Sequence, residues 1–169
     1  MQALRNLMDK VVMFICVVLF VEMTIVGTYQ IVVRYFFNSP STVSEEIVTY
    51  SFTWLSILAA AYVFGKREHL AMTFLTSHFR GASKVYLDIF SELLVILTAV
   101  FLLIYGGYIM TVENADQSTN ALTVSMGLMY AVLPISGVII TIYGIMNLID
   151  LVKKLSSPDL AEYGKPVEE

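Results

Sequence analysis

Four long runs of apolar residues, separated by polar segments, dominate the pattern of this chain. A helix needs about 20 mainly apolar residues to cross the hydrocarbon core of a bilayer. Runs of this length are too long for the alternating strands, about ten residues each, of a membrane barrel. The pattern therefore predicts an all-α integral membrane protein with four transmembrane helices. We place these helices at about 11–33, 47–64, 87–110 and 126–149.

Local signals mark the ends of the second span and a bend in the fourth. Residues 38–41 read Asn-Ser-Pro-Ser, which is typical of a turn. Thr42, followed by Glu45, fits a capping box at a helix start, and Gly65 fits a C-cap. Pro134 lies inside the fourth run, where we expect it to bend the helix. None of the spans is expected to be interrupted.

Two segments outside the spans have distinct patterns. In residues 68–79 the apolar side chains fall on one face, which predicts a short amphipathic helix in the membrane interface; an ordinary loop packed under the bundle is the alternative. Residues 156–169 are polar, and we expect a disordered tail there. Residues 1–155 then form one membrane domain.

The basic residues predict the orientation. Nine of the ten Lys and Arg residues fall on one side of the predicted spans, and Arg34 is the exception. Because cytoplasmic loops carry the excess of Lys and Arg, we expect both termini in the cytoplasm. The nine residues are Arg5, Lys10, Lys66, Arg67, Arg80, Lys84, Lys153, Lys154 and Lys165.

Composition agrees with a membrane location. Of the 169 residues, 57% are hydrophobic and 14% are charged, whereas soluble domains carry about 25% charged residues. The net charge of −4, with no basic run, argues against nucleic-acid binding. The single cysteine, Cys16, excludes an internal disulfide and any multi-cysteine metal site. We therefore expect a protein of the membrane with no metal or other cofactor.

Two glutamates lie at membrane depth. Glu22 sits eleven residues from each end of the first span, where a carboxylate is costly and by default functional. Proton coupling or cation binding is one interpretation; a protonated or hydrogen-bonded glutamate that fixes helix assembly is favoured. Glu92 continues a Lys84–Asp88 stripe, which we expect to face a partner or water. A cation site shared by Glu22 and Glu92 is a less favoured alternative.

Enzymatic chemistry is not indicated. No nucleophile–base set, phosphate-binding glycine loop or metal-spaced cluster occurs in the chain, and neither His69 nor His78 lies in a span where it could hold a haem. Independent carriers usually show repeats and interrupted spans, which this pattern lacks. Small residues in the second and fourth spans permit close helix contact, within the chain or with another chain. They are Ser56, Ala60, Gly137, Thr141 and Gly144. We therefore predict a subunit of a larger membrane assembly.

An ordered set of short motifs resembles a known family. It runs from residue 34 to residue 70 and reads Arg-Tyr-Phe-Phe-Asn-Ser-Pro, Ser-Glu-Glu, Phe-Thr-Trp, Ala-Ala-Ala-Tyr and Gly-Lys-Arg-Glu-His-Leu. The series resembles the small, Q-type membrane subunit of tripartite ATP-independent periplasmic (TRAP) transporters. The resemblance implies a bacterial inner-membrane protein bound to a large M-type subunit that carries the transport site.

That resemblance further implies a sodium-driven importer of organic acids, of dicarboxylate or sialic acid type. A periplasmic binding protein would deliver the substrate, and the small subunit would brace the scaffold of the large subunit and contribute to the docking surface. In this role we expect Arg34, Glu45 and Glu46 to order the periplasmic edge by pairing with one another or with a partner, or else to act as helix caps and a solvated arginine. Trp54 is expected to pack rather than bind a ligand, and His69 to contact groups at the cytoplasmic edge.

Two other functions are compatible with the pattern. A small proton-coupled multidrug exporter also has four helices and a membrane glutamate in the first, which Glu22 would supply. An assembly subunit of an unrelated membrane complex is the other alternative. The sequence indicates neither the substrate nor the helix faces that contact a partner.

Overall fold

The computed structural model describes residues 2–66 and 82–155. His69 and the segment 68–79, for which an interfacial helix was expected, lie outside the described residues, as does the predicted tail 156–169.

The described residues are almost entirely helical, and the prediction of an all-α fold is confirmed. Four long helical segments are apolar enough to cross a membrane, and each contains one predicted span; they cover Gln2–Phe36, Thr42–Lys66, Ser83–Glu113 and Met126–Lys153. The individual elements are α1 (Gln2–Phe36), α2 (Thr42–Lys66), α4 (Ala82–Thr98), the π-helix η1 (Ala99–Gly106), α5 (Gly107–Glu113), α6 (Met126–Tyr130) and α7 (Val132–Leu155).

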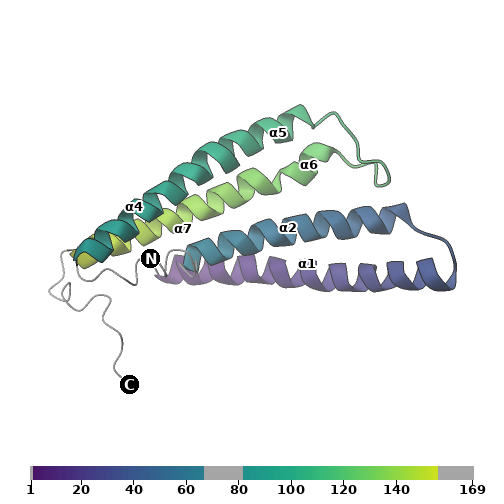
Figure 1. The fold of residues 1–169 in the computed structure, drawn as a ribbon, viewed down its shortest axis with the longest axis horizontal. Coiled ribbons are helices and arrows are strands. Elements are labelled where there is room, and N and C mark those ends of the chain that lie inside the picture. Colours follow the sequence, from purple (N-terminus) through teal and green to yellow (C-terminus); the bar gives the residue numbers. More distant parts are fainter. Residues whose placement is uncertain (1, 67–81, 156–169) are drawn as a thin grey trace, which may run out of the picture.

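These elements form two helical hairpins (Figure 1). The first hairpin is α1 with α2, and the second pairs α4, η1 and α5 with α6 and α7. Both hairpins have their free ends, including the N-terminus, at one end of the molecule, which we name the terminal end. Their connections, residues 37–41 and 114–125, lie at the other end, named the loop end. The hairpins converge at the terminal end and diverge toward the loop end, where the 114–125 loop reaches back toward α2 (Figure 1).

The fourth span is the centre of the molecule. In its most apolar window 44% of the residues are buried within the chain, against 6% for the first span and 11% for each of the other two. The fourth span is the most buried because α7 packs against α4, η1 and α2, whereas α1 packs along α2. The core where α2, η1 and α7 meet is built on Ala61, Ala99 and Ile140.

Both spans of the second hairpin depart from a regular α-helix, at η1 in the third span and at Ala131 in the fourth. The two irregular stretches lie at the same depth. The fourth span is divided at Ala131, three residues before Pro134, into α6 and α7, so the expectation that no span is interrupted is wrong there. Pro134 lies in the first turn of α7, where a missing N–H leaves no helical bond unmade. Gly107, which follows η1, packs so closely on this break that a Cβ there would lie 2.9 Å from Pro134 Cδ.

Two expected capping residues have other roles. The α2 start is capped by Ser41 rather than Thr42: Ser44 N donates to Ser41 Oγ at 3.3 Å, and Thr42 is already helical. Gly65 lies within α2, which ends at Lys66, and is not a C-cap. A Cβ at Gly65 would lie 2.6 Å from Tyr143 Cγ, so glycine is required there because the α7 tyrosine ring packs on the α2 backbone.

Candidate partner interface

A buried polar network at the terminal end joins all four spans. At its centre is Asn147 of α7, whose side chain is 1% exposed. Its Nδ2 donates to Glu92 Oε1 of α4 at 2.8 Å and to the Gly65 carbonyl of α2 at 3.3 Å. Its Oδ1 accepts from Arg5 Nη2 of α1 at 2.6 Å, and the same nitrogen contacts Asp150 Oδ2 at 3.2 Å. We name these five residues the Asn147 network.

The position of Glu92 corrects two expectations. Glu92 is 6% exposed and bonded to Asn147, so it lies inside the bundle and not on a face toward a partner or water. Glu22 lies seventeen residues from Arg5, about 25 Å further along α1. Because Glu92 belongs to the same network as Arg5, the two glutamates lie at different depths and share no cation site.

A second set of contacts supports the network from the α1 side. Tyr143 is 1% exposed, and its hydroxyl donates to Asp9 Oδ1 at 2.6 Å. Lys66 Nζ lies 4.0 Å from Asp9 Oδ2 and 4.8 Å from the centre of the Tyr62 ring. These contacts hold the end of α2 and the start of α1 against α7.

Glu22 is isolated from this chemistry. Its side chain is partly buried on α1, and its Oε2 is buried with no hydrogen-bond partner among the described residues. The hydroxyls of Thr24 and Thr28 nearby donate to backbone carbonyls of their own helix. Burial of an unpaired carboxyl oxygen is costly, so we expect this group to find a partner beyond the described residues.

At the loop end, Glu46 bridges the two hairpins. Its Oε1 accepts from Ala121 N and its Oε2 from Leu122 N, both at 3.0 Å. Two backbone donors on one carboxylate hold the 114–125 loop against α2. Thr123, next in the loop, has a φ of 53°, and the Ser118–Ser125 bridge closes the loop on itself.

Arg34 and Glu45 behave differently from Glu46. Both are exposed, and no ion pair in residues 2–66 and 82–155 joins Arg34 to either glutamate. Glu46 does order this edge, but through backbone amides of its own chain and not through Arg34. Pairing of Arg34 or Glu45 with another chain stays a prediction.

Trp54 makes the second bridge at the loop end. Its side chain is half-buried between α2 and α6, and Nε1 donates to the Met129 carbonyl at 3.2 Å. Met129 comes just before the break at Ala131, where helical carbonyls lose their usual donors. The indole therefore both packs and satisfies a backbone group at membrane depth.

The structure separates the two faces of small residues. On α7, Gly137 packs on Leu103 and Ile104, and Gly144 packs on Ile96, so this face is used within the chain. On α2, Ser56 and Ala60 are exposed. The second face therefore remains open to lipid or to a helix of another chain.

Sequence reasoning missed the centre of the polar network. Asn147 was passed over because it stands in an otherwise uncharged span, and Asp9 because it precedes the first span. Asn147 carried a usable signal, because a polar side chain in a membrane helix usually faces the bundle interior. Their partners were not predictable, since pairing depends on how the helices are rotated.

The arrangement of these groups limits the chemistry available. Polar contacts between spans gather at the terminal end and in the loop-end half, and the described residues contain no group of three or more His, Cys, Asp or Glu side chains that could hold a metal. Within residues 2–66 and 82–155, these bonds join helices to each other. They stabilise one arrangement of the spans.

Comparison with known proteins gives one consistent result. Residues 23–154 match the family described as tripartite ATP-independent periplasmic transporters, DctQ component. A Haemophilus influenzae protein named as a TRAP transporter small permease is 26% identical over 152 residues, which cover 90% of this chain and 94% of that protein. The sialic acid TRAP transporter small permease protein SiaQ of Vibrio cholerae is 26% identical over 155 residues, 92% of this chain and 89% of that protein.

Proposed function

The chain belongs to the DctQ-component family of TRAP transporters, the small permease subunits, and we propose that within its transporter it braces the immobile scaffold of a large membrane subunit. Members of this family are multi-pass inner-membrane transport components and not enzymes. In this proposal the large subunit carries the transport site, and a periplasmic binding protein delivers the substrate.

The observation that carries the proposal is where the polar contacts lie. In the described residues, the buried groups that link spans serve to hold helices together, with Asn147 touching α1, α2 and α4. No described Lys, Arg or His lies in the middle of a span, where an organic anion would need a positive partner. A helix bundle closed in this way suits a stationary wall better than a transport pathway.

The surface of the first hairpin supports contact with a second membrane protein. Only 6% of the apolar window of α1 and 11% of that of α2 is buried within the chain. Among the exposed residues of α2, Ser56 and Ala60 leave room for close approach of another helix. We propose that this face contacts the large subunit.

The orientation of the chain in the membrane follows the distribution of its basic residues. We propose that the terminal end is cytoplasmic, because the basic side chains Arg5, Lys10, Lys66, Lys84 and Lys153 lie there. The exposed Arg34 and Glu45 then stand at the periplasmic rim, where they contact the binding protein or the large subunit. The substrate is an organic acid, of the sialic acid or dicarboxylate type, and its import is driven by sodium.

Purification in mild detergent with an affinity tag on this chain tests the bracing role. We expect a much larger membrane protein to be recovered in equal amount. Ala60→Phe should reduce that recovery, whereas Val138→Phe, at an exposed position of α7, should not. A lone, monodisperse protein that moves solute unaided in vesicles would contradict the proposal.

A proton-coupled exporter remains the second candidate because Glu22 Oε2 is buried and unpartnered among the described residues. Glu22→Gln separates the two functions. Loss of the large subunit on purification supports a role in assembly. Complete loss of transport with the complex intact supports direct proton or ion chemistry at Glu22.

A further inference from the structure

The four spans form a row in which each helix packs mainly on its neighbours. Among the described residues, α1 packs on α2, α2 packs on α7, and α7 packs on the third span, which is α4 continued by η1. Neighbouring helices lie about 8–10 Å apart, so the axes of the two outer spans are about 27 Å apart. A shift of each helix along the next one therefore changes how the whole row can sit in a bilayer.

Close contacts place one residue of each span at the same level. Gly65 of α2 lies against the ring of Tyr143 of α7, and the hydroxyl of Tyr143 donates to Asp9 of α1. Gly144, the residue after Tyr143, packs on Ile96 of the third span. We name the level of Asp9, Gly65, Tyr143 and Ile96 the reference level.

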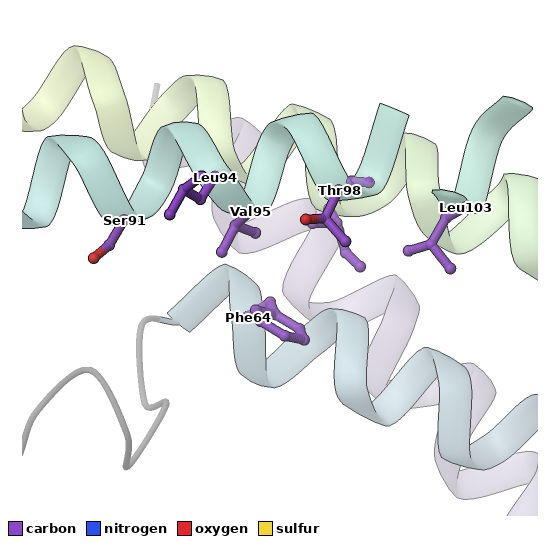
Figure 2. A pocket seen from close by; sticks show the side chains of 8 residues that line it. Phe64, Ser91, Leu94, Val95, Thr98 and Leu103 are labelled. Carbon is purple, nitrogen blue, oxygen red and sulfur yellow. The ribbon is translucent and has the colours of Figure 1, made fainter. Parts of the chain in front are cut away.

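A close-up of the two hairpins agrees with this level (Figure 2). Phe64, next to the α2 glycine, lies across from Val95 and Thr98 of the third span, and these side chains line one cavity. The end of α2 is therefore level with the middle of the third apolar run, 87–110.

The four apolar runs are not centred at one level. Glu22, the centre of run 11–33, lies thirteen residues, or about 20 Å, from the reference level toward the loop end. The centres of runs 47–64 and 126–149 lie about 15 Å and about 9 Å from it, and the centre of run 87–110 lies about 3 Å from it. The offset decreases steadily along the row and changes by about 17 Å from α1 to the third span.

The lengths of the runs indicate the same geometry. An offset of about 17 Å across a row of about 27 Å corresponds to an inclination of about 30°. A helix inclined by about 30° needs about 35 Å, or about 23 residues, to cross a hydrocarbon core of about 30 Å. The runs 11–33, 87–110 and 126–149 contain 23 or 24 residues each. Transmembrane helices are observed at inclinations up to about 40°.

An upright row conflicts with the exposed side chains. If the centre of the bilayer lay at one level for all four spans, the exposed charges of Lys10 and Glu113 would lie in hydrocarbon, where a charged group is costly. Ile31 and Phe90, which are 60% and 59% exposed, would lie outside the hydrocarbon. In the inclined row the two charges lie beyond the core and the two apolar side chains lie within it.

We propose that the row of four helices crosses the bilayer at an inclination of about 30°, so that lipid covers an oblique belt of its exposed apolar side chains. The contacts that set this inclination lie within the chain, so it does not depend on the bracing role. A helix of another protein that packs lengthwise on α2 must be inclined in the same way.

Exposed aromatic side chains mark the two lipid surfaces. Tyr35 and Phe36 at the loop end of α1 are 77% and 82% exposed, and Phe37 after them is 72% exposed. Adjacent residues of a helix project about 100° apart, so one partner helix cannot cover both Tyr35 and Phe36, whereas a lipid interface can. At the start of the third span, Tyr86 is 64% exposed at the opposite surface. Such rings are enriched at both membrane–water interfaces.

Depth measurements at two pairs of exposed positions test the inclination. Val11 and Leu97 both lie within about 3 Å of the reference level, and Ile25 and Val112 both lie about 24 Å from it. In an upright row the two members of each pair have the same depth. In the inclined row, Leu97 is deeper than Val11 and Ile25 is deeper than Val112, by about 13–15 Å in each pair.

Spin labels report these depths in vesicles. The variants Val11→Cys, Leu97→Cys, Ile25→Cys and Val112→Cys are made in a full-length Cys16→Ser chain, with any co-purifying subunit retained. Oxygen collides most often with labels at the bilayer centre, and a water-soluble nickel chelate collides most often with labels near the surface. The ratio of the two collision rates gives the depth even where another protein partly shields a label. We expect a higher ratio of oxygen to nickel collisions at Leu97 and at Ile25 than at their partners.

A second probe repeats the comparison without cysteine. Trp is placed at the same four positions in a Trp54→Phe chain, and its fluorescence is quenched by lipids brominated at known depths. Circular dichroism of each variant verifies that the helices are intact. Equal depths within either pair, or a difference in the opposite order, would overturn the proposal.

Discussion

The two ends of the molecule hold the same pair of hairpins together with different chemistry. At the terminal end, side chains of α1, α4 and α7 and the Gly65 carbonyl of α2 meet at Asn147, whose amide bonds to both Arg5 and Glu92. At the loop end, Glu46 and Trp54 of α2 each bond to backbone groups of the second hairpin. The contact between the hairpins at the terminal end therefore depends on side chains that bond to each other. The contact at the loop end depends on the backbone conformation of a loop and of a helix break.

This difference predicts different responses to mutation. Buried polar side chains that satisfy each other form a unit, so the loss of one member leaves several groups unpaired. A carboxylate bonded to a loop restrains that loop, and its loss should remain local. We therefore expect the terminal end to determine whether the bundle stays closed, and the loop end to determine how far the hairpins diverge.

Asn147→Leu should have the largest effect. It removes the amide between Glu92 and Arg5 and frees the Gly65 carbonyl, at a cost of about 3 kcal/mol. Thermal unfolding of the detergent-purified protein measures this loss. Asn6→Leu, the same change at an exposed position of α1, is the control and should be nearly neutral. Equal unfolding temperatures for both variants would show that the Asn147 network is not the main interaction that stabilises the bundle.

Gly65→Ala should have the next largest effect. The added Cβ would lie 2.6 Å from Tyr143 Cγ, so α2 and α7 must separate, at a cost of about 1–3 kcal/mol. Gly27→Ala adds the same methyl group where no atom lies within 4 Å, and it should be neutral or slightly stabilising. Thermal unfolding of the two variants, side by side, gives the comparison. A neutral Gly65→Ala would mean that the helices are not in tight contact there.

Glu46→Ala should have a smaller, local effect. The Ala121 and Leu122 amides lose their acceptor, and we expect a loss of about 1–2 kcal/mol confined to the loop end. Hydrogen–deuterium exchange should become faster in residues 114–125 and remain unchanged in α7. Glu45→Ala, at the exposed neighbour, should leave exchange in the loop as it is. Faster exchange around Asn147 as well would show that the two ends are coupled.

Trp54→Phe should have the smallest effect. It keeps most of the apolar contact and removes the bond to the Met129 carbonyl, which for polar contacts between membrane helices is worth about 0.6–1.7 kcal/mol. Exchange of the amides in α6 should increase slightly, with little change in the unfolding temperature. Phe52→Leu, at an exposed position of the same helix, is the control. A loss of stability as large as that of Asn147→Leu would show that contacts at the loop end stabilise the bundle as much as the Asn147 network does.

Much of the fold could be predicted from local features. The four spans follow from the length of apolar runs, and the break at Ala131 lies three residues before Pro134, which cannot donate a helical hydrogen bond. The cap of α2 was predicted one residue late, because Ser41 and Thr42 are both good capping residues and local sequence does not choose between them. The family followed from an ordered set of motifs in residues 34–70, and the match over residues 23–154 confirms it.

The sequence by itself determined what is set by composition along the chain: helices long enough for a bilayer, and membership of a family whose motifs it carries. Only the tertiary structure decided which polar groups meet. Gly65 was predicted to be a helix C-cap, but it lies within α2, where the Tyr143 ring packs on its backbone. Glu92 was predicted to face a partner or water, but it bonds to Asn147 inside the bundle. Such pairings depend on the rotation and register of helices, which are set by packing between distant residues rather than by neighbours in the chain.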